Sequence, residues 1–129
     1  MAGALNRPDV ERIEALEVAA IEHILLDDSQ PEIMDTLRHQ YAKSKIHRRR
    51  FRDVGFSSRL WVDSDAPRLQ KRDRFHLGNL DAEVEGLEYG LGFVLYVRDG
   101  WLETLEVFTY GETFPECLTT FRVHPVEAV

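Results

Sequence analysis

Two apolar runs rich in β-branched and aromatic residues stand out in the C-terminal half of the chain. They are Leu91–Arg98 and Trp101–Thr109, and only the dipeptide Asp99-Gly100 separates them. A type I′ turn needs positive φ at both central residues, so Asp-Gly between two such runs is among the strongest sequence signals of a β-hairpin. The pattern therefore predicts a β-hairpin that turns at Asp99-Gly100.

Strand alternation then assigns the side chains of this hairpin to its two faces. A two-residue turn places Phe93 opposite Glu106, on the face that also holds Leu95 and Leu102. Because both faces carry apolar residues, we expect the hairpin to lie in the middle of a sheet with cover over most of both sides. Glu106 would then need a buried Arg or Tyr partner.

The N-terminal third of the chain has helical periodicity. Apolar residues recur at three- and four-residue steps from Val10 to Leu25, which predicts a helix that begins near Asn6 and buries one stripe. Polar residues at 27–29 interrupt the stripe, and Pro31 fits the first turn of a second helix. Residues 1–44 are therefore predicted to form a helical hairpin.

From residue 45 onward the period changes from helix to strand. Residues 46–52 and 56–62 alternate like two strands around a turn at 53–55, residues 63–74 form a polar loop, and residues 75–85 and 118–123 are further extended segments. We predict one α+β domain over 1–129, in which two N-terminal helices pack on an antiparallel sheet of about five strands over 45–129. The hairpin at Asp99-Gly100 is expected at the centre of this sheet.

Composition agrees with an ordinary globular domain, since 43% of the 129 residues are hydrophobic and 30% are charged. The single cysteine, Cys117, cannot form an internal disulfide, which suits a reducing compartment. No stretch approaches the roughly 18 apolar residues of a membrane span, and the N-terminus lacks a secretory pattern. We expect a cytoplasmic protein without a membrane segment.

Charge is unevenly distributed along the chain, whose net charge is −7. Residues 45–75 hold 10 Lys and Arg against 4 Asp and Glu, between two acidic segments. The favoured interpretation is that these charges pair with acidic neighbours across the sheet. The alternative is a strip that binds an anion or a partner, formed by Arg48, Arg49, Arg50, Arg52 and Trp61.

Residues 86–113 read GLEYGLGFVLYVRDGWLETLEVFTYGET and are followed by Phe114-Pro115-Glu116. Together with the upstream strand GFSSRLWV, this segment resembles a group of small uncharacterised bacterial proteins that share a glycine-rich lead, a DG hairpin and an aromatic-Pro ending. The chain departs from that pattern at Val107, where the group has glycine, and at Phe114, where it has tryptophan. The resemblance implies a fold, and no activity, cofactor or catalytic residue.

Carboxylates alternate along the extended segment before the hairpin and could form a ligand pocket between helices and sheet. The residues for such a pocket are Glu83, Glu85, Glu106, Tyr96, Tyr110 and Arg49. The favoured alternative is a solvated or Arg-paired sheet face, because the spacing is not that of a calcium loop. The five histidines lack zinc spacing, and no nucleophile motif occurs, so we expect no metal, no cofactor and no catalytic residue.

These observations favour a non-enzymatic protein-binding module, of inhibitor or immunity type, with a protein partner or a second copy of itself. One alternative is an enzyme or a ligand- or metal-binding domain that uses the carboxylate pocket. The other is single-stranded nucleic-acid binding through the basic and aromatic stretch 45–74. Nucleic acid is disfavoured because the chain as a whole is acidic.

Overall fold

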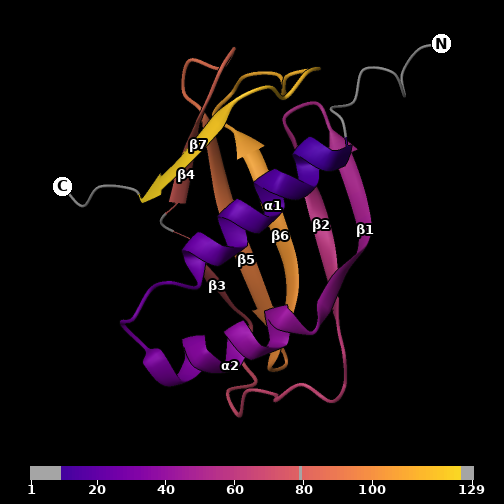
Figure 1. The fold of residues 1–129 in the computed structure, drawn as a ribbon, viewed down its shortest axis with the longest axis vertical. Coiled ribbons are helices and arrows are strands. Elements are labelled where there is room, and N and C mark those ends of the chain that lie inside the picture. The colour runs from indigo at the N-terminus through magenta and orange to yellow at the C-terminus, as the bar shows by residue number, and fades with distance from the viewer. Residues whose placement is uncertain (1–9, 79, 126–129) are drawn as a thin grey trace.

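The computed structural model describes residues 10–78 and 80–125. They form two helices and one seven-stranded sheet in a single α+β arrangement (Figure 1). No helix in this part of the chain has the length and apolar character needed to cross a membrane. In chain order the elements are α1 (Val10–Ile24), α2 (Pro31–Ala42), β1 (Ser44–Arg52), β2 (Gly55–Val62), β3 (Phe75–Leu77), β4 (Leu80–Val84), β5 (Leu91–Arg98), β6 (Trp101–Thr109) and β7 (Phe121–Pro125).

Both helices form where apolar residues recur with helical spacing. In α1 the buried residues Ile13, Leu16, Ala20, Ile21 and Ile24 make one stripe, as the periodicity predicts. Helix α2 has Pro31 in its first turn and buries Met34 and Leu37. The predicted start of the first helix near Asn6 lies outside the described residues.

The sheet is antiparallel throughout, and its strand order is β1-β2-β6-β5-β4-β7. Strand β3 also pairs with β5, along the same edge of β5 that pairs with β4. The sheet has seven strands where about five were expected. One reason is that the extended segment 75–85 is divided into two strands. Strand β3 pairs with the second half of β5, at Leu95–Val97, and β4 pairs with the first half of β5, at Leu91 and Gly92. The fold class is confirmed, and the strand number was wrong.

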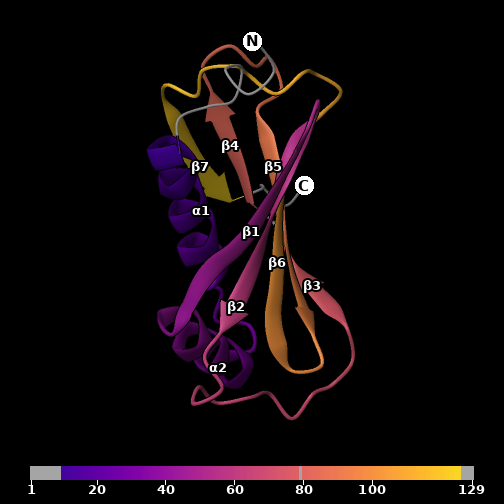
Figure 2. The ribbon, with the colours of Figure 1, turned by 90° about the vertical axis from the view of Figure 1, so that its right-hand side faces the viewer.

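The helices pack on one face of this sheet, as Figures 1 and 2 show. The side chains that β5 and β6 direct into the core are Leu91, Phe93, Leu95, Val97, Leu102, Leu105 and Val107. In the described part of the chain no helix covers the opposite face, which we call the open face. The prediction that most of both faces would be covered was therefore wrong. Val94 and Tyr96, which point to the open face, are only half-buried.

A β-bulge changes the faces predicted for β6. Arg98 lies opposite Trp101 and Val97 opposite Leu102, with positive φ at Asp99 (53°) and Gly100 (85°). The register then shifts, and Glu103 is left without a partner in the ladder. One extra residue reverses the face of every later side chain. Phe93 therefore lies opposite Val107, whereas Glu106 lies opposite Val94 on the open face, which corrects the expected apolar setting of Glu106.

Candidate functional site

The first two strands present arginines on the open face. Alternation along β1 and β2 exposes Arg48, Arg50 and Arg59, while Arg49 points toward the helices. In the ladder Arg48 lies opposite Arg59, and Arg59 lies opposite Thr104 of β6. The same register places Arg50 opposite Ser57. Three guanidinium groups and two hydroxyl groups from three neighbouring strands thus share one surface.

These five side chains line a hollow of about 220 Å³, which we call the arginine hollow: Arg48, Arg50, Ser57, Arg59 and Thr104. Within residues 10–78 and 80–125, no carboxylate oxygen lies within 4.0 Å of a nitrogen of these three guanidinium groups, although other arginines of the same segment are paired. Like charges held together without counter-ions repel one another, and a bound anion would relieve that repulsion. The arginine hollow is therefore a candidate anion site.

A second hollow, of about 490 Å³, adjoins the first and is lined by Trp61, Trp101 and Glu103, with Arg59 common to both hollows. Trp61 is 50% exposed, and the Lys45 ammonium lies 5.2 Å from its ring centroid. An exposed tryptophan beside cations is typical of surfaces that anchor a partner, because it offers apolar area with little conformational freedom to lose.

The predicted anion-binding set is divided by the sheet. Arg48, Arg50, Arg52 and Trp61 lie on the open face, and Arg52 pairs with Glu106 at 3.8 Å. Arg49 belongs to the other face, where it pairs with a glutamate of α1. Arg49 therefore does not share a surface with the rest of this set, because β-strand alternation separates it from its two neighbours.

Arg49 fastens β1 to α1. Its Nε and Nη2 atoms donate to the two carboxylate oxygens of Glu17 at 2.8 and 2.7 Å, and Ser58 donates a third hydrogen bond to Glu17. The hydrogen bonding of Arg49 to Glu17 raises the pKa of Arg49, whereas burial lowers it. The Glu17 side chain is 3% exposed, so the ion pair is nearly desolvated on the carboxylate side.

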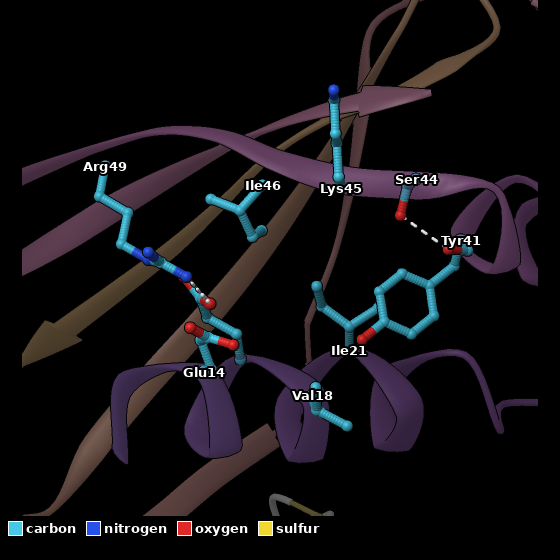
Figure 3. Close-up of a pocket in the computed structure, with 9 residues that line it drawn as sticks. Glu14, Val18, Ile21, Tyr41, Ser44, Lys45, Ile46 and Arg49 are labelled. Atoms are coloured by element: carbon cyan, nitrogen blue, oxygen red, sulfur yellow. Dashed lines mark hydrogen bonds and ion pairs between the residues drawn. The ribbon is translucent and has the colours of Figure 1, made fainter. Parts of the chain in front are cut away.

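Beside this ion pair lies a cavity of about 470 Å³ between α1 and β1 (Figure 3). Glu14, Val18, Tyr41 and Lys45 are among its lining residues. Burial, followed by the charges of Glu22 and Glu17, raises the pKa of Tyr41.

Among the described residues no buried side-chain polar atom lacks a hydrogen-bond partner. Because both oxygens of Glu17 are engaged, the ion pair serves to hold the helix on the strand.

The carboxylates predicted to line a pocket do not converge. Glu83 pairs with Arg122 of β7, with Arg122 Nε 3.0 Å from its Oε2, and this hydrogen bond lowers the pKa of Glu83. Glu85 accepts a hydrogen bond from Thr120 at 3.3 Å. Glu106 lies two strands away, beside β2. No group of three or more His, Cys, Asp or Glu that could hold a metal occurs among the described residues.

The two tyrosines of the predicted pocket are separate as well. Tyr110 donates a hydrogen bond to Asp81 at 2.5 Å, and burial followed by this hydrogen bond raises the pKa of Tyr110 to about 12. Its hydroxyl lies over Gly92, where a Cβ atom would be only 2.5 Å from the hydroxyl oxygen. Tyr96 lies opposite His76 and Thr104 in the ladder. The structure thus gives each predicted ligand residue a different neighbour.

Comparison with protein-family models, curated proteins and solved structures finds no match to this chain. The resemblance to small bacterial proteins stays a prediction.

Three residues of the arginine hollow were missed in the sequence: Ser57, Arg59 and Thr104. The position of Arg59, two residues before Trp61 on the same strand face, was a usable signal, because side chains two apart in a strand point the same way. Thr104 had no such signal, since the bulge at Glu103 decides which face it occupies.

Proposed function

We propose that this protein is a non-enzymatic binding module whose open face recognises an acidic segment of a partner protein, in the manner of an inhibitor or an immunity-type factor. The observation that carries the proposal is the arginine hollow, where three arginines share one surface and no carboxylate of the described chain neutralises them. Cytoplasmic location is part of the proposal, and the lone exposed cysteine suits it.

The setting of the arginine hollow supports a protein partner. Across the open face, Arg48, Arg59, Thr104, Tyr96 and His76 follow one another as ladder partners from β1 to β3. With strands about 4.8 Å apart, this row spans about 19 Å, which is enough for several residues of an extended segment. Charges on such a surface steer a partner and fix its orientation, and the exposed Trp61 supplies an apolar anchor.

The enzyme and ligand-pocket alternatives gain no support from the geometry. Glu83 and Glu85 lie at the end of β4 and Glu106 lies on β6, all with different partners, and Glu83 and Glu106 each already pair with an arginine. An acid/base or metal site requires such groups to converge on one point.

Single-stranded nucleic acid is the second candidate, favoured by aromatic rings beside cations on the open face. The Arg74 guanidinium lies 4.8 Å from the Tyr96 ring centroid, and Lys45 lies over Trp61. Such surfaces stack bases and contact phosphates. Against this candidate, the same face carries Asp81 and Glu83 on β4, and the chain has a net charge of −7.

The test compares two double variants of the full chain. Arg48→Gln/Arg50→Gln removes two charges from the arginine hollow, and Arg12→Gln/Lys43→Gln removes two exposed charges from the helical part. Binding of a short fluorescein-labelled peptide of alternating Glu and Leu is measured by anisotropy at low ionic strength. We expect the first variant to bind about tenfold more weakly than wild type and the second to bind normally.

Three outcomes would contradict the proposal. Equal weakening in both variants would mean that only net charge matters. Failure of the acidic peptide to bind at all would remove the open face as a recognition surface. Tighter binding of single-stranded oligo(dT) than of the peptide, with strong salt dependence, would favour the nucleic-acid candidate instead.

A further inference from the structure

We propose that the group bound in the arginine hollow is a phosphate monoester on a phosphorylated side chain of the partner protein. This inference rests on the proposed function and narrows it from acidic segments in general to phosphorylated ones. Its basis is the number, kind and placement of the donors that line the hollow.

The donors outnumber what a carboxylate can accept. Each guanidinium group carries five N–H donors, and the hydroxyls of Ser57 and Thr104 add one each. A carboxylate offers two oxygens in one plane, whereas a phosphate monoester offers three oxygens arranged around a tetrahedral atom. Three arginines can therefore each approach a different side of a phosphate, which is the usual way in which arginine clusters read phosphorylated motifs.

The strand register places these donors around a common point. Arg48, Arg59 and Thr104 form one row across β1, β2 and β6, and Arg50 and Ser57 lie in the next row. Residues two apart on one strand face are about 7 Å from each other, and neighbouring strands are about 4.8 Å apart. A group of phosphate size between the two rows lies within reach of side chains from all three strands.

Charge also favours a phosphate. A phosphate monoester carries about −1.5 to −2 at pH 7, against −1 for a carboxylate, so it neutralises more of the three positive charges. Glu106 lies opposite Ser57 in the ladder, and its carboxylate is directed to Arg52 at 3.8 Å. Glu106 thus stands at the rim of the arginine hollow and weakens anion binding there by repulsion.

The neighbouring hollow indicates how a phosphorylated segment would lie. Arg59 lines both hollows, and Trp61 and Trp101 line the second one. A large apolar side chain close to the phosphorylated residue would fill that space. A nucleic acid would instead require a row of phosphate sites, each for a diester with a single charge.

The test uses three synthetic peptides that are identical except at one central position, which holds serine, glutamate or phosphoserine, with leucine nearby. Titration calorimetry with the full chain is expected to show the phosphoserine peptide binding at least about tenfold more tightly than the glutamate peptide. Arg59→Gln and Ser57→Ala/Thr104→Val are each expected to remove this preference. Arg12→Gln/Lys43→Gln is expected to keep it, and Glu106→Gln to increase it. Thermal unfolding of each variant checks that it is folded.

The outcomes separate this inference from the proposed function. Equal binding of the phosphoserine and glutamate peptides would overturn the phosphate assignment and leave recognition of acidic segments intact. Binding of neither peptide would overturn both. Inorganic phosphate binding as tightly as the phosphoserine peptide would show a site for free phosphate, and tighter binding of oligo(dT) would show a nucleic-acid surface. Either result would overturn the assignment to a phosphorylated protein.

Discussion

Glu17 and Arg49 form the most deeply buried ion pair among the described residues. The Glu17 side chain is 3% exposed and that of Arg49 is 21% exposed. Two charges taken out of water are tolerated only when their hydrogen bonds are made, and here Ser58 completes the set on Glu17. The pair therefore joins α1 to the sheet through hydrogen bonds of fixed geometry, which apolar contacts alone do not provide.

Glu17→Ala is predicted to lower the free energy of unfolding by about 3 kcal/mol, because it leaves the Arg49 guanidinium half-buried without its counter-charge. Urea denaturation of wild type and variant measures this difference. The double variant Glu17→Ala/Arg49→Ala should lose less stability than the two single variants added together. Additive losses would show that the ion pair is not coupled.

Tyr110 is predicted to make stability depend on pH in the alkaline range. Its pKa is raised from 10.0 to about 12 by burial and by the hydrogen bond to Asp81, so the folded protein holds this proton more tightly than the unfolded chain. The resulting stabilisation is fully present below pH 10 and is lost as pH rises from 10 to 12. Tyr110→Phe should remove this part of the alkaline loss in urea denaturation.

A spectroscopic control distinguishes Tyr110 from the other tyrosines. Absorbance titration of phenolate formation in wild type and Tyr110→Phe gives the ionisation of Tyr110 by difference. Asp81→Asn should move that ionisation to lower pH, since it removes the negative charge beside the phenol. An unchanged titration in Asp81→Asn would contradict the contribution of Asp81 and leave burial as the cause of the raised pKa.

At the scale of elements, Gln40 ties α2 to the turn between β5 and β6. Its Nε2 donates to the carbonyl oxygens of Pro67 at 2.8 Å and Gly100 at 2.9 Å, and its Oε1 accepts from the Leu102 N–H at 2.9 Å. The side chain is fully buried. One amide thus bonds three backbone groups, one in the loop 63–74, one in the turn and one in β6.

Gln40→Leu is predicted to lower the free energy of unfolding by about 2 kcal/mol, since it leaves the buried Leu102 N–H and the part-buried Pro67 carbonyl without this partner, whereas the Gly100 carbonyl still accepts from the Leu69 N–H. Gln70→Leu, at an exposed position of the same loop, is the matched control and should change stability little. Both are measured by urea denaturation. Similar losses in the two variants would show that the buried hydrogen bonds of Gln40 contribute little.

Helical stripes and strand runs were readable in the sequence because burial repeats with a fixed period. The stripe of α1 and the runs of β5 and β6 follow that rule. The bulge at Glu103 does not follow that rule. It does leave a trace in the sequence, because the inward residues Leu102, Leu105 and Val107 are spaced by three and then by two. The role of Gln40 was not predictable, because its partners are backbone atoms far away in the chain.

At the scale of the whole molecule, the basic segment divides into cations that pair with carboxylates and cations that do not. The expected pairing of the basic segment holds for Arg49, Arg52 and Arg68, each of which has a carboxylate partner. Among the described residues it does not hold for Arg48, Arg50 and Arg59, which supply the charge of the candidate site, or for Lys45 and Arg74, which lie over aromatic rings. Sequence alone could indicate the basic segment but could not show which arginines remain available, since that depends on strand alternation and register.

The extra residue in β6 also determines how this chain could change in length. Glu103 has no partner across the ladder, whereas the residues after it alternate regularly between core and open face. Loss of Glu103 alone would leave each of those residues on its present side. Loss of Glu106 with the bulge kept would instead turn the remainder over, directing Val107 to the open face and Phe108 into the core. Length variation in this strand is therefore tolerable at the bulge and damaging beyond it.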